Sequence, residues 1–104
     1  MSDDAALLTA TFVVDPFHPA FAGHFPGRPI LPGVALLAEV MEHWLVQSPQ
    51  ALQAQWTFDA VKFLAPVGPG ARLTMTVRAR VRGHGFEVRH GNTLVASGQL
   101  TVQE

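Results

Sequence analysis

The chain has 104 residues, a formal net charge of −1 and no cysteine, which predicts one domain over residues 1–104. The missing cysteines exclude disulfides, thiolate catalysis and zinc-thiolate sites. Seven basic and eight acidic residues give no general reason to expect a nucleic-acid or anionic-membrane partner. Because no apolar run approaches the ~20 residues of a membrane span and no secretory signal is recognisable, a cytoplasmic protein is expected. Only 14% of residues are charged and 48% are hydrophobic, which indicates that another chain covers some apolar surface.

The first predicted elements are a strand and a long loop. Residues 7–14 contain the β-prone run Thr-Phe-Val-Val, which Asp15-Pro16 ends. Prolines recur throughout residues 16–32, so this segment is predicted to be an ordered loop. Loops of this length inside a compact domain are often functional.

A helix is predicted over residues 33–47, which hold good helix formers and no internal glycine or proline after Gly33. Ser48-Pro49 ends it. The helix is apolar around most of its circumference, a pattern typical of a buried helix. In a small domain a single helix is buried only if a sheet wraps it.

The remaining residues are predicted to supply that sheet. Residues 55–64 form a strand, and residues 71–81 form another with strict apolar/polar alternation. Residues 83–85 are predicted as a turn, followed by a hairpin of residues 86–90 and 93–102 around Gly91-Asn92. The fold class is therefore α+β, with an antiparallel sheet wrapped around one long helix.

Two motifs carry a family resemblance. The sequence FAGHFPGRPILPGVALL (21–37) is dense in glycine and proline around one histidine, and VKFLAPVGPGARL (61–73) follows downstream. Together they resemble segments of the hotdog-fold 3-hydroxyacyl-acyl-carrier-protein dehydratases, in particular the short stand-alone members associated with aryl-polyene synthesis. The resemblance implies a hotdog fold that dimerises through its sheets. It also implies dehydration of 3-hydroxyacyl thioesters to trans-2-enoyl thioesters, in fatty-acid or aryl-polyene synthesis, without a cofactor.

His24 is the candidate base of that reaction, since an imidazole titrates near working pH. The surrounding prolines restrict the loop, and the helix start beside Pro32 offers free amides, with Gly33 as the expected oxyanion donor. The resemblance places Phe25, Pro32 and Val34 with Gly33 in the substrate-binding part of the site. A simpler interpretation of His24 is a histidine that hydrogen-bonds to the backbone and stabilises the loop.

The acidic partner of the histidine departs from the family pattern. The relatives carry Glu or Asp six positions after the proline that precedes the helix, and here that position is Ala38. Glu39 is the candidate acid, although it lies ~100° further around the helix. Glu42, His43 or a water are alternatives, Asp59 is an outside candidate, and Glu39, Glu42 and His43 are also consistent with a solvated stripe.

Three functions therefore remain open. The first is the dehydratase, with acyl carrier protein bearing a phosphopantetheine-linked chain as partner and a homodimer, a higher homo-oligomer or a hetero-oligomer with another hotdog chain as the assembly. The second is a non-catalytic partner subunit or acyl-binding protein, favoured by Ala38. The third is an acyl thioesterase. No metal is assigned, because His18, His84 and His90 lack metal-ligand spacing.

Overall fold

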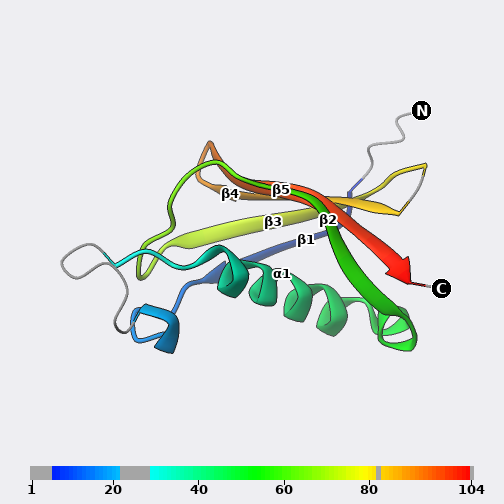
Figure 1. Ribbon diagram of the computed structural model, residues 1–104, viewed down its shortest axis with the longest axis horizontal. Coiled ribbons are helices and arrows are strands. Elements are labelled where there is room, and N and C mark those ends of the chain that lie inside the picture. Colours follow the sequence, from blue (N-terminus) through cyan, green and yellow to red (C-terminus); the bar gives the residue numbers. More distant parts are fainter. Residues whose placement is uncertain (1–5, 22–28, 82, 104) are drawn as a thin grey trace.

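The fold consists of one antiparallel sheet with a single long helix packed on it (Figure 1). A computed structural model of the chain describes residues 6–21, 29–81 and 83–103. The strands lie in the order β1-β3-β4-β5-β2, and every neighbouring pair is antiparallel. The elements in chain order are β1 (Ala6–Val13), η1 (Pro19–Phe21), α1 (Gly33–Gln47), η2 (Pro49–Gln53), β2 (Gln55–Phe63), β3 (Arg72–Ala79), β4 (His84–His90) and β5 (Thr93–Gln103).

Helix α1 occupies the residues predicted from the sequence, beginning after the N-cap Pro32 and ending before Ser48. Its side chains at every fourth position, Leu36, Val40 and Trp44, are buried. This stripe packs on the sheet face formed by buried residues of the strands, among them Leu73 and Val88. Burying one such side chain contributes about 1.5–3 kcal/mol to folding.

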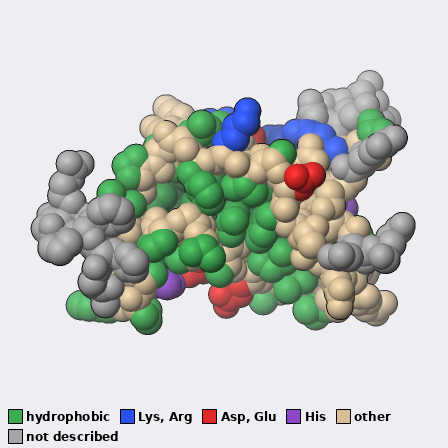
Figure 2. Space-filling model, in the orientation of Figure 1, with side chains coloured by type: hydrophobic (Ala, Val, Ile, Leu, Met, Phe, Trp, Pro, Cys, Tyr) green, Lys and Arg blue, Asp and Glu red, His purple; other side chains and the backbone are tan. Residues whose placement is uncertain are grey.

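The expectation of a helix buried all round is corrected by the exposed side of α1. Val34 and Val46 are 76% and 70% exposed, because the sheet of a single chain covers only one side of the helix. In the view of Figure 2, hydrophobic side chains gather in the middle of the molecule, in the region where Figure 1 shows α1 and β2. An apolar surface of this kind is typical of a protein–protein contact.

Strand β4 begins earlier than the sequence predicted. The expected turn at residues 83–85 is wrong in part, because His84 pairs with Ala79 and Leu100 and is already in the strand. Gly85 lies next to the side chain of Arg80, whose Nε would be 3.0 Å from a Cβ at that position. The glycine therefore serves close side-chain packing inside the sheet rather than a turn.

The edge strand β2 is irregular in the middle. Its register with β5 shifts between Asp59 and Lys62, and Ala60 has a φ of 51°. The Asp59 carboxylate accepts a hydrogen bond from the Ala60 amide at 2.8 Å, which supports this bulge.

The short helix η2, which was not predicted from the sequence, connects α1 to β2. None of the described helices is long and apolar enough to cross a membrane.

Candidate functional site

The two sequence motifs meet at the N-terminal end of α1. The Leu31 amide donates a hydrogen bond to the Val67 carbonyl at 2.7 Å, which joins the segment before the helix to the segment after β2. Between them lies a cavity of about 430 Å³. It is lined by residues 30–33, Leu36 and residues 63–67. Its volume falls in the range of small-molecule sites, about 300–1,000 Å³.

In the part of the chain that the structure describes, the first turn of α1 has two amides without an acceptor, and one of them belongs to Gly33 in the cavity lining. The Pro32 carbonyl accepts hydrogen bonds from the Ala35 and Leu36 amides, at 3.0 and 3.1 Å. Within the described residues, the amides of Gly33 and Val34 have no acceptor. Such N–H groups at the positive end of a helix stabilise negative charge on an oxygen.

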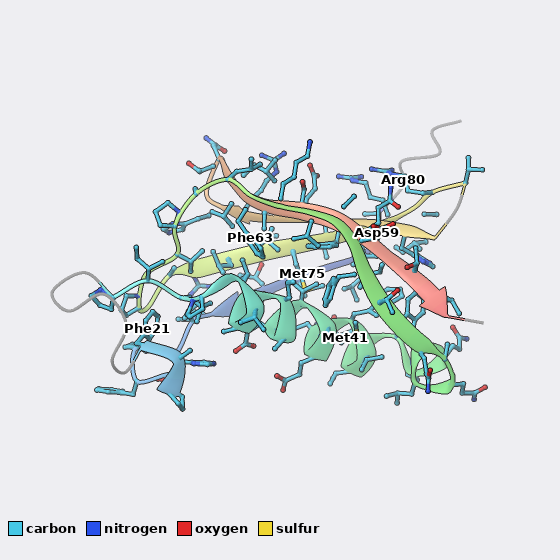
Figure 3. All side chains as sticks on the ribbon, in the orientation of Figure 1. Phe21, Met41, Asp59, Phe63, Met75 and Arg80 are labelled. Carbon is cyan, nitrogen blue, oxygen red and sulfur yellow. The ribbon has the colours of Figure 1, made fainter. Side chains whose placement is uncertain are left out.

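Gly33 is in close contact with the aromatic ring of Phe63. A Cβ at Gly33 would lie 2.6–2.9 Å from three atoms of that ring, too close for any larger residue without movement. Phe63 ends β2 and lies over the first turns of α1 (Figure 3). The glycine therefore lets Phe63 form a wall of the cavity directly beside the free amide.

The other predicted site residues have different positions. His24 and Phe25 lie outside the described residues, so their roles stay predictions. Pro32 is the N-cap and lines the cavity with Gly33. Val34 is exposed on the side of α1 that the sheet leaves uncovered.

Glu39 lies on the side of α1 that faces β1 and η1. Its Oε1 is 3.8 Å from His18 Nε2, and its Oε2 is 4.0 Å from His43 Nε2. His43 stacks on Phe12 of β1 with ring centroids 4.5 Å apart. Met41, two residues along the helix, lines a different hollow with residues of η2 and β2 (Figure 3). Glu39 is not among the residues that line the cavity at Gly33.

The other candidates for the acid lie outside the cavity lining, and so does Ala38, where the relatives carry the acid. Ala38 and Glu42 are exposed on α1. His43 faces Phe12 and Glu39, and Asp59 is engaged by the Ala60 amide. Among the described residues, no group of three His, Asp or Glu side chains has the geometry to hold a metal ion.

An aromatic cluster that the sequence analysis missed lies at the other end of α1. The rings of Trp44, Trp56 and His84 have centroids 5.2–5.3 Å apart. Burial lowers the pKa of His84 below its ordinary value, because a desolvated imidazole disfavours its charged form. The unexpected start of β4 hid this contact, since His84 was assigned to a turn.

The comparison with protein families decides the family. The model of the ApeI-like family, described as ApeI dehydratase, matches residues 1–99. The chain belongs to the ApeI-like dehydratase family. One curated relative of this chain is the 3-hydroxyacyl-[acyl-carrier-protein] dehydratase FabZ of Anaeromyxobacter sp. (strain Fw109-5). The two sequences are 32% identical over 82% of this chain and 60% of the relative. The chain thus spans about 60% or less of the length of the curated relatives it matches.

Solved structures confirm the hotdog fold of this family member. The dehydratase heterocomplex ApeI:P from Xenorhabdus doucetiae contains a chain that matches with a TM-score of 0.76 and 23% identity, over 99% of this chain and 100% of that one. The fluoroacetyl-CoA-specific thioesterase FlK matches with a TM-score of 0.61 and 21% identity, over 96% and 91% of the two chains. Because enzymes of both reaction types share the architecture, these structural matches establish the fold and not the reaction.

Proposed function

We propose that this protein dehydrates 3-hydroxyacyl thioesters carried on acyl carrier protein, forming trans-2-enoyl thioesters. The observation that carries the proposal is the pair of amides at Gly33 and Val34, which have no acceptor among the described residues, with Gly33 in the lining of an apolar cavity where both motifs meet. The family membership supports the same reaction class. A thioester carbonyl bound at these amides would have its oxygen stabilised as negative charge develops.

In the proposed mechanism, His24 removes a proton from the carbon next to the thioester carbonyl. The electron pair moves toward the carbonyl, whose oxygen is held by the Gly33 amide, and the bond from the adjacent carbon to its hydroxyl breaks. An acid protonates the departing hydroxyl, which leaves as water. The apolar lining around Phe63 and Leu36 holds the acyl chain and excludes solvent from the reacting carbons.

A second candidate function is a subunit that requires another hotdog chain to complete the site. It is favoured by the exposed Ala38, which occupies the position where the family resemblance calls for an acid. The related structure is itself described as a heterocomplex. In this alternative the partner chain supplies the carboxylate, while this chain supplies His24 and the helix amides.

Hydration of a crotonyl thioester, the reverse reaction, tests the proposal. We expect the purified chain, alone or mixed with a second hotdog chain, to consume the enoyl thioester and form the 3-hydroxyacyl product. Turnover only in the mixture assigns the partner-subunit role. Release of free thiol without hydration would instead identify a thioesterase and overturn the dehydratase proposal.

A further inference from the structure

Glu39 is placed to hold two parts of the chain together. Its two carboxylate oxygens lie near different histidines, 3.8 Å from His18 Nε2 and 4.0 Å from His43 Nε2. The side chains of Glu39 and the two histidines are 24% and 27% exposed, so solvent screens these contacts only in part. At these distances the contacts are electrostatic rather than close hydrogen bonds.

His18 is fixed by the backbone around η1. Its Nδ1 accepts a hydrogen bond from the Ala20 amide at 3.0 Å, so the neutral ring carries its proton on Nε2, the atom that faces Glu39. The His18 amide donates to the Asp15 carbonyl at 2.9 Å, and the His18 carbonyl accepts from the Phe21 amide at 3.0 Å. Because His18 accepts hydrogen bonds from two residues of η1, a shift of the His18 ring would also displace this short helix.

The other oxygen of Glu39 faces His43, and the His43 ring contacts β1. His43 lies one helical turn after Glu39 and stacks on Phe12, with an angle of 19° between the rings. Glu39 thus lies between η1 on one side and the helix–β1 contact on the other. Met41 lies ~200° around the helix from Glu39 and faces β2, so the Glu39 side of α1 is distinct from the side toward the β2 edge.

The location of η1 gives this contact a functional consequence. Phe21, the last residue of η1, precedes His24 by three positions in the sequence. On the other side of residues 22–28, Leu31 is anchored to Val67 at 2.7 Å. Phe21 and Leu31, the described residues nearest to His24 that make these contacts, are thus each held by a backbone hydrogen bond.

We propose that Glu39 is a positioning residue: through His18 it holds η1 on α1, and with it Phe21, three positions before His24 in the sequence. It does not serve as the acid of the dehydration. The inference rests on the proposed function for its catalytic consequence, while the contact with η1 is measurable without any activity.

Hydrogen exchange and kinetics of three variants test this role. Glu39→Ala is expected to raise the exchange rates of the Ala20 and Phe21 amides about tenfold. It is also expected to lower kcat about tenfold with KM nearly unchanged, since small misplacements of a base are costly. Glu39→Gln removes the carboxylate charge on which these contacts of 3.8 and 4.0 Å depend, so it is expected to raise the same exchange rates and to lower kcat in the same direction. Gln47→Ala, at an exposed position on the same helix, is the control and should change neither.

A double-variant cycle separates positioning from catalysis. If Glu39 acts through His18, the kcat losses of Glu39→Ala and His18→Ala are not additive, and the double variant resembles either single one. Loss of activity in Glu39→Gln equal to that in Glu39→Ala, with unchanged exchange at Ala20 and Phe21, would show that Glu39 is the acid and overturn the inference. Absence of turnover in the wild-type protein in every assembly would instead refute the proposed function, and the exchange rates would still decide whether Glu39 holds η1.

Discussion

At the scale of single residues, the site depends on the close approach of Gly33 and Phe63. Gly33→Ala would place a Cβ within 3 Å of the Phe63 ring and push the ring into the cavity. We expect kcat/KM for thioester hydration to fall about tenfold, while the double variant Gly33→Ala/Phe63→Ala should match Phe63→Ala alone. Wild-type activity in Gly33→Ala would show that this contact does not shape the substrate site.

His84 makes folding stability depend on pH. Its pKa is lowered in the folded protein by burial, so the unfolded chain binds the proton first as the pH falls. The contribution of the neutral His84 imidazole to the free energy of unfolding is fully present above the ordinary pKa of 6.5. It declines as the pH falls below that value. Urea unfolding from pH 7.5 to 5 should therefore show a smaller loss of stability in His84→Phe than in wild type. An equal loss in both proteins would contradict this assignment, and His90→Phe, at an exposed position, is the control.

At the scale of elements, the bulge in β2 is a point of backbone strain. Ala60 has a φ of 51°, a left-handed conformation that costs an L-residue about 1–2 kcal/mol. Glycine removes this strain but loses more entropy on folding, so Ala60→Gly is expected to stabilise the protein by about 0.5–1 kcal/mol. Chemical denaturation measures this, with Ala79→Gly, at the last residue of β3 and without a positive φ, as a control that should destabilise. A less stable Ala60→Gly variant would show that the bulge is unstrained.

The elements were more predictable than the contacts between them. Local signals determined α1, since the helix begins after Pro32 and ends before the Ser48-Pro49 pair. The alternation of apolar and polar residues identified β3. The start of β4 was misassigned because a Gly-His-Gly stretch favours a turn locally, whereas pairing with Ala79 and Leu100 extends the strand. The contact of Glu39 with His18 joins residues 21 positions apart through a loop, and no periodicity indicates it. Gly33 at the helix start was predicted, but its contact with Phe63 depends on how β2 packs over α1.

At the scale of the whole molecule, the exposed apolar side of α1 and the end of β2 predict an assembly. Val34, Val46, Phe63 and Leu64 are each more than half exposed in the single chain, which is unfavourable for a small domain with little charge. We expect sedimentation equilibrium at low micromolar concentration to give at least twice the chain mass of 11.2 kDa, alone or with a second hotdog chain. A stable monomer in both conditions would contradict this expectation.

The central claim is that His24 and the amides at the start of α1 carry out a dehydration together. The most direct measurement follows a 3-hydroxyacyl chain on acyl carrier protein by mass spectrometry, with wild-type protein and with His24→Ala, each alone and mixed with a second hotdog chain. We predict loss of one water to give the enoyl thioester in the wild-type assembly, and a rate at least about 100-fold lower with His24→Ala. Equal rates for the two proteins, or hydrolysis of the thioester in place of dehydration, would contradict the account.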